Sequence, residues 1–280
     1  MTASAADAGG ARRRFVAPPR SEVGAERFDH PLYQDLAPWR DLLAAAVWPS
    51  VQALDQRLAL PRKHLVAQDD ALLADGLHFE QRIATGRIAT RADNWHDLFN
   101  ALVWARYPLI KQALNARQCE RIAANGPSRR DRAQAALTQF DESGVIVRVR
   151  DAALLDAWNQ HDWTALFVDE AAAWQDGRIA VAAVIGHALM EQGLLEGRLL
   201  VGKCVVAQGD VDADCIEAVA KAIATGRVLN DPLELRPLPL MGVPNWHARQ
   251  DAALYGQVDY FRPLREGRTY PGPGSCVTGR

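Results

Sequence analysis

Residues 94–104 read NWHDLFNALVW, and we expect the fold to be organised around this stretch. It combines two tryptophans, a phenylalanine and several aliphatic residues with a histidine, an aspartate and two asparagines. A spacing of four places Trp95 and Phe99 on one helical face, while His96 and Asn100 share another. The stretch therefore predicts a helix with a packing face and a polar face. The polar face is either a wall of a functional site or a hydrogen-bonded strut.

The composition is that of an ordinary globular protein. Of the 280 residues, 49% are hydrophobic and 24% are charged, with a net charge of −2. No overall basic field would recruit nucleic acid, so nucleic-acid binding is not expected. The four cysteines are widely spaced, which argues against disulfides and structural zinc and favours reduced thiols in the cytoplasm. No apolar run approaches the roughly 20 residues that span a bilayer, so a membrane partner is not expected.

The order of the segments predicts an α+β fold that is predominantly helical. We expect a single compact domain at residues 28–265, between a disordered tail at 1–27 and a flexible tail at 266–280. Valine-rich runs at 145–149 and 199–207 predict two of a few short strands. An extended proline-rich segment follows towards the C-terminus.

Three further segments carry local predictions. Residues 178–195 predict one continuous helix, because their apolar side chains recur at helical spacing. Residues 77–90 alternate around Gly86 and predict a hairpin-like pair of strands. Residues 128–139 predict a helix that starts at its first residue in the manner of a capping box, followed by a polar turn at 140–144.

Several motifs in this chain resemble those of a bacterial family catalogued only as a domain of unknown function. The resemblance spans roughly residues 30–265 and implies a single-domain bacterial protein. It implies no activity, cofactor or catalytic residue. The motifs are NWHDLFNALVW at 94–104, FDESG at 140–144, GHALMEQ at 186–192 and PLPLMGVPNW at 237–246.

A sharper hypothesis joins the polar residues of these motifs around one pocket. His187 and Glu191, four apart on a predicted helix, could hold one divalent metal, with His96 and either Asn100 or Asp97 completing the shell. The metal would acidify a water molecule for hydrolysis. In a metal-free version His96 is the general base and Asp141 or Asp97 orients it. The catalytic candidates are His96, Asp97, Asp141 and Glu142, the metal candidates are His187 and Glu191, and further pocket candidates are Asn100, Arg130 and Trp246.

Structural interpretations compete with each of these roles. His187 follows Gly186 in an apolar run and fits a core histidine. Arg130 fits a solvated helix start, and Trp246 fits either a lid over a pocket or a plug in a gap. Two functions therefore remain open. The first is a small soluble enzyme, such as a metal-assisted hydrolase acting on a small molecule. The second is a non-catalytic binding module whose polar cluster is structural.

Overall fold

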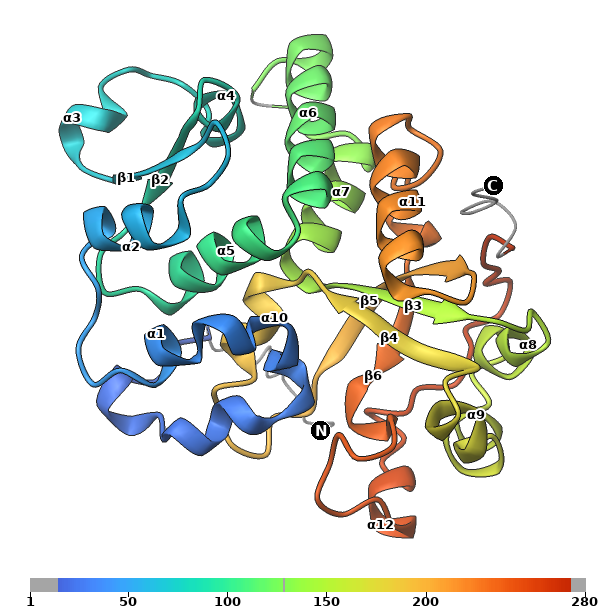
Figure 1. Ribbon diagram of the computed structural model, residues 1–280. Coiled ribbons are helices and arrows are strands. Elements are labelled where there is room, and N and C mark those ends of the chain that lie inside the picture. Colours follow the sequence, from blue (N-terminus) through green and yellow to red (C-terminus); the bar gives the residue numbers. More distant parts are fainter. Residues whose placement is uncertain (1–14, 128, 273–280) are drawn as a thin grey trace, which may run out of the picture.

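A four-stranded sheet and a separate pair of strands lie among many helices in the computed structural model, which describes residues 15–127 and 129–272 (Figure 1). The α+β class and the predominance of helix expected from the sequence are confirmed. Within the described ranges, no helix combines the length and the apolar composition needed to cross a membrane.

The four-stranded sheet has the order β4-β3-β5-β6. Its strands are β3 (Gly144–Val149), β4 (Ile179–Val184), β5 (Val201–Gln208) and β6 (Arg236–Pro239). β3 pairs antiparallel with β4 and parallel with β5, and β5 pairs antiparallel with β6. Every residue of β3 is buried, as expected for a valine-rich strand that is covered on both faces. The prolines of β6 are tolerated because β6 is an edge strand.

Helices α6 (Pro108–Asn125), α7 (Arg132–Ser143) and α11 (Asp212–Ala224) lie on one side of this sheet (Figure 1). Helix α7 begins after Asp131, whose carboxylate accepts from the backbone N–H of Gln134 in a complete capping box. The helix start predicted at residue 128 lies outside the described residues, and the structure places the cap three residues later.

Two predicted elements are wrong. The polar turn at 140–144 is absent, because α7 continues to Ser143 and β3 starts at the next residue. The helix predicted at 178–195 is instead β4 followed by α10 (His187–Gln192). Its first half is apolar and β-branched enough to pair with β3, and the chain then turns at Gly186.

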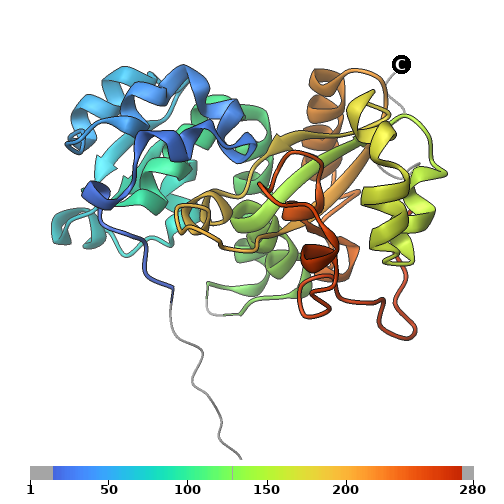
Figure 2. The ribbon, with the colours of Figure 1, turned by 90° about the horizontal axis from the view of Figure 1, so that it is seen from below.

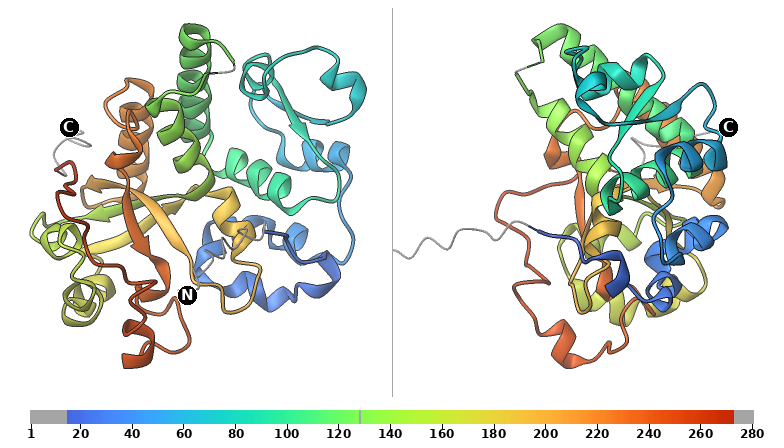
Figure 3. Two further views of the ribbon diagram at one scale, coloured as in Figure 1. Left: turned by 180° about the vertical axis from the view of Figure 1, so that it is seen from behind. Right: turned by 90° about the vertical axis from the view of Figure 1, so that its left-hand side faces the viewer.

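A smaller group of elements, here called the lobe, lies beside α6. It consists of α2 (Val51–Leu58), β1 (His64–Ala67), α3 (Asp70–Leu73), α4 (Phe79–Ala84) and β2 (Arg87–Thr90). Strands β1 and β2 are parallel, so a crossover must join them, and α3 and α4 form it. Figure 3, seen from behind, shows the lobe beside α6, with α5 between the lobe and the sheet.

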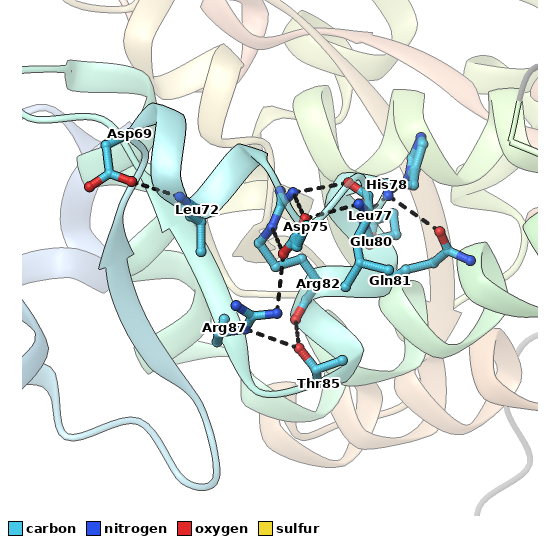
Figure 4. A network of polar contacts seen from close by, with 10 residues as sticks. All are labelled: Asp69, Leu72, Asp75, Leu77, His78, Glu80, Gln81, Arg82, Thr85 and Arg87. Carbon is cyan, nitrogen blue, oxygen red and sulfur yellow. Dashed lines mark hydrogen bonds and ion pairs between the residues drawn. The ribbon is translucent and has the colours of Figure 1, made fainter.

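The hairpin predicted at 77–90 is wrong because its first half is helix α4. The imidazole of His78 caps this helix, and Gln81 completes the capping box. Figure 4 shows the network that holds α4 in place: Asp75 accepts from the guanidinium of Arg82 at 2.6 and 3.1 Å and from that of Arg87 at 3.1 Å. The Asp75 carboxylate thus ties α4 to the start of β2.

Helix α5 (Trp95–Arg106) is the predicted NWHDLFNALVW helix. Its cap is Asn94, whose side chain accepts from the Asp97 N–H at 3.0 Å. On the packing face Trp95 stacks on Phe99, with ring centroids 5.8 Å apart. On its other sides α5 packs against α10 and α6.

The N-terminal segment from residue 15 packs against α5. Arg20, in η1 (Arg20–Glu22), is 8% exposed, and its guanidinium lies over the rings of Trp48 and Trp95 at 4.4 and 4.8 Å. Residues 15–27 therefore differ from the disordered tail that the sequence predicted, because Arg20 anchors them. Residues 1–14 of that predicted tail lie outside the described residues.

The remaining helical segments are short. Figure 2 shows the lobe and the N-terminal segments at one end of the molecule and α8 and α9 at the other. These segments are η2 (Ala25–Asp29), η3 (Pro31–Trp39), α1 (Arg40–Ala44), α8 (Leu154–Asn159), η4 (Ala165–Asp169), α9 (Ala171–Gln175), η5 (Pro232–Glu234), η6 (Leu240–Gly242) and α12 (Ala252–Tyr255).

Candidate functional site

A cavity of about 330 Å³ lies between the lobe and helices α5, α6 and α7. This volume is at the lower end of the range of small-molecule pockets. The cavity is lined by Glu80 from the lobe, His96 from α5, Lys111 from α6, Asp141 from α7 and His187 from α10. Five elements that are far apart in the sequence thus contribute titratable side chains to one space.

His96 lies at the centre of a chain of contacts. Its Nδ1 is 3.1 Å from Glu191 Oε2, and its Nε2 is 3.1 Å from His187 Nε2. The two rings are nearly perpendicular, with centroids 4.4 Å apart. The polar face of α5 therefore meets the helix that carries His187 and Glu191. His187 is buried, whereas the side chain of His96 is 30% exposed, so His96 is the ring that a ligand could reach.

The chain continues through Asp141 to Lys111. Asp141 Oδ2 lies 3.8 Å from His187 Nδ1, and Asp141 Oδ1 accepts from the ammonium of Lys111, which is 4% exposed. Burial alone would raise the pKa of Asp141, but the charge of Lys111 holds it below its ordinary value. Burial is also the main reason why the pKa of His187 falls to about 3. At neutral pH, Asp141 is therefore ionised and His187 is neutral.

A neutral His187 carries one ring proton, which sets the direction of its hydrogen bonds. With the proton on Nδ1, His187 turns an N–H towards Asp141 and accepts from His96 through Nε2. With the proton on Nε2, it donates to His96. The contact between the two Nε2 atoms thus requires one proton, which either ring can carry. The row of polar groups from Glu191 through His96, His187 and Asp141 to Lys111 is here called the proton-relay chain; its step from His187 to Asp141, at 3.8 Å, is longer than a hydrogen bond.

The predicted metal pair does not converge on one point. His187 and Glu191 are four apart on α10, as expected, but both contact His96 through different ring nitrogens. Across residues 15–127 and 129–272, no three His, Cys, Asp or Glu side chains are grouped so as to hold a metal ion. The described side chains therefore suit a hydrogen-bonded relay better than a coordination shell.

Glu80 is the site residue that the sequence did not suggest. The amide of Asn115 donates to its Oε2 at 2.7 Å and to its backbone carbonyl at 2.8 Å. Burial, followed by the charge of Asp141, raises the pKa of Glu80 to about 7. Both of its protonation states are therefore populated near neutral pH, as expected for a general acid or base. The local signal was Gln81 three residues after His78, which marks a helix start with an unusual cap.

One known protein family covers the residues of this site. Residues 63–265 match the family described as protein of unknown function (DUF3025). The chain belongs to this family. The resemblance to an uncharacterised family, which the sequence motifs suggested, is thereby confirmed. The part that matches DUF3025 contains every residue from Glu80 to Glu191 discussed above. No curated protein and no solved structure matches the chain.

Within the DUF3025 region, two predicted candidates serve other purposes. Asp97 accepts from the backbone N–H of Arg91 at 2.6 Å and from its guanidinium at 2.8 and 3.0 Å. It therefore fixes the junction between β2 and α5 and does not orient His96. Trp246 does not line the cavity. It packs edge-on against His30, whose Nε2 contacts the Trp246 carbonyl at 2.7 Å, so it fits the plug and not the lid.

The other predicted residues line the cavity. Asn100 is buried in its wall, whereas Glu142 and Arg130 are exposed side chains of the lining. Within the described ranges, neither Glu142 nor Arg130 forms a hydrogen bond or an ion pair through its side chain. His78, to which the sequence assigned no role, also lines the cavity.

Proposed function

We propose that this protein is an enzyme that hydrolyses a small polar molecule by general acid–base catalysis, without a metal ion. The observation that supports this most strongly is the meeting of Glu80 with the His96–His187 pair in one cavity. Glu80 comes from the lobe, whereas the histidines come from α5 and α10. Two groups able to exchange protons are thus supplied by separate parts of the fold.

The chemistry requires one proton acceptor and one proton donor. Ionised Glu80 takes a proton from a water molecule, whose oxygen attacks the electrophilic atom of the substrate. The bond to the leaving oxygen breaks, and that oxygen takes the Nε2 proton of His96 in its doubly protonated form, whose Nδ1–H stays on Glu191, so that the ring is left neutral. The proton on Glu80 then returns to His96 through solvent, which restores the starting state. Each such transfer typically contributes about 10²–10⁴-fold to the rate.

The proton-relay chain keeps the donor ready. Lys111 holds Asp141 ionised, and the carboxylate favours a His187 ring that presents Nδ1–H to it. His187 Nε2 is then free to accept from His96, while Glu191 holds the other nitrogen of His96. His187, Asp141, Lys111 and Glu191 act through His96 and are positioning residues.

Buried polar atoms without partners favour a site over a purely structural network. A structural network usually satisfies all of its members, because an unpaired buried polar atom costs about 1–3 kcal/mol. Here Asn100 Oδ1 and Trp104 Nε1 are buried, and neither finds a hydrogen-bond partner among the described residues. Both residues line the cavity.

The test is a panel of hydrolytic reporters, comprising nitrophenyl esters, phosphates, anilides and glycosides, assayed from pH 5 to 9. We expect turnover by the wild-type protein with at least one reporter, insensitivity to chelators, and a loss of about 100-fold in E80Q and H96N. Matched controls are E196Q and H64N, which replace exposed residues away from the cavity.

Three outcomes would contradict the proposal. The first is the absence of turnover across the panel. The second is turnover that E80Q retains in full. The third is turnover that a chelator abolishes and a divalent metal restores, which would return the reaction to the metal-assisted mechanism.

A further inference from the structure

The cavity carries a second feature, a set of buried carboxamides here called the carboxamide wall: Asn100, Asn115, Gln118 and Gln134. From it we infer that the cavity binds a neutral ligand with several hydroxyl groups, a sugar or polyol. This inference rests on the proposed function, because it names the class of molecule that carries the bond to be hydrolysed.

The four residues are buried, with exposed fractions of 7% for Asn100, 6% for Asn115, 8% for Gln118 and 5% for Gln134. Pockets for small molecules are usually lined mainly by apolar side chains, with few polar groups. Four buried amides in one cavity are therefore a departure. Among their unused hydrogen-bonding atoms, Asn100 Oδ1 is itself buried and lacks a partner in the described part of the chain, whereas those of the other three residues keep contact with solvent and are available to a ligand.

Helix α6 supplies two of these amides. Asn115 uses its nitrogen to bond Glu80, and its oxygen accepts no hydrogen bond within the described ranges. Gln118 donates to Thr138 Oγ1 at 3.0 Å and to the Gln134 carbonyl at 3.4 Å, and its oxygen is likewise unused by the described residues. These two oxygens belong to residues three apart on α6, so they occupy neighbouring positions on one helix face.

The other two amides present different atoms. Gln134 accepts from the Asp131 N–H at 3.1 Å through its oxygen, while its nitrogen donates to no described residue. The carboxamide of Asn100 makes no hydrogen bond in the described part of the chain, and its oxygen is buried. The carboxamide wall thus offers both donors and acceptors, and at Asn100 a complete amide.

Hydroxyl groups match this pattern, because each one both donates and accepts. Opposite charges balance in the cavity lining, so net charge does not select the ligand. Lys111 pairs with Asp141 and Arg91 with Asp97, while Arg130 and Glu142, unpaired among the described residues, carry charges of opposite sign. The ring of Phe79 lines the same cavity and is 39% exposed, so it offers an apolar surface for the C–H face of a sugar ring. A volume of about 330 Å³ suits a ligand of one or two sugar rings.

A substitution at Asn100 can test ligand binding without disturbing the fold. Since its amide bonds no described residue, replacing it with the similarly sized leucine removes an unpaired buried polar group. We expect N100L to fold with unchanged or increased stability and to bind the ligand about tenfold more weakly. Q52L is the matched control, because Gln52 is an exposed amide on α2 outside the cavity.

The experiment is saturation-transfer NMR followed by calorimetry on the full chain. The probes are glucose, galactose, mannose, N-acetylglucosamine, ribose and myo-inositol, with glycylglycine and inorganic phosphate as comparators. Saturable binding of at least one sugar or polyol, weakened in N100L and unchanged in Q52L, is the expected result. Absence of saturable binding by all six sugars and polyols, binding of the comparators instead, or equal affinity in N100L and wild type would overturn the inference.

The same samples separate the ligand from the reaction. If E80Q still binds a sugar and no variant shows turnover, the inference about the ligand stands and the proposed enzymatic function is wrong. Turnover of a reporter that lacks hydroxyl groups, with no sugar binding, would sustain the hydrolase and remove the ligand class.

Discussion

Replacing Glu80 with glutamine should make the stability of the protein less dependent on pH. Burial raises the pKa of this carboxyl from its ordinary value of 4.5 to about 7. Between these values the folded state binds a proton that the unfolded state releases, so the wild-type protein loses stability as pH rises through this window. The gap corresponds to about 3 kcal/mol, an upper bound because Glu80 retains some contact with solvent.

Glutamine keeps the acceptor that bonds Asn115 and cannot ionise. Relative to wild type, E80Q should therefore gain about 2–3 kcal/mol of unfolding free energy between pH 4.5 and 7.5 and no more above that pH. Urea unfolding, followed by tryptophan fluorescence at half-unit pH steps, gives the difference between the two proteins directly. All other titrating groups cancel in that difference.

A flat difference between pH 4.5 and 7.5 would refute the assignment of a raised pKa to Glu80. So would a difference that falls as pH rises, because it would mean that folding favours the ionised carboxylate. E196Q is the control and should give a flat line, because Glu196 is exposed.

Three more predictions follow from the same region. D141N leaves the buried ammonium of Lys111 without its carboxylate and should cost about 3–5 kcal/mol by urea unfolding; a cost below 1 kcal/mol would contradict this. G186A places a Cβ 2.6 Å from Ser143 Cα, so it should lower the melting temperature by several degrees, whereas an unchanged value would show that this contact relaxes freely. The pKa of His187 lies at about 3 in the folded protein, so its neutral form stabilises the fold above pH 6.5, and this stabilisation is lost as pH falls towards 3. H187Q should therefore lose less stability than the wild-type protein between pH 6.5 and 4.5, as measured by calorimetry.

The core of the site could be predicted from sequence because its spacing is local. The helical periodicity of residues 94–104 placed His96 on a polar face, and the spacing of His187 and Glu191 put both on one helix turn. The structure brings these three residues together at 3.1 Å. Their roles in catalysis remain proposals.

What escaped prediction depends on contacts between distant residues. Residues 179–184 have both helical and strand character, and pairing with β3 decides for the strand. Lys111 gains significance only because Asp141, thirty residues later, covers it. Glu80 was hidden because a histidine caps its helix, where serine, threonine, aspartate or asparagine would have revealed the start.

The two hydrogen bonds from Asn115 to Glu80 join the lobe to α6 at the cavity. Contact with the rest of the protein keeps water from the Glu80 carboxyl. The pKa of this carboxyl therefore depends on how closely the lobe packs against α6. If the lobe moved away from α6, the pKa of Glu80 would return towards 4.5. If the lobe closed more tightly on α6 around a ligand, the pKa would rise above 7. A single carboxyl resonance, titrated with and without sugar, would therefore measure closure of the cavity from a residue that also takes part in the proposed reaction.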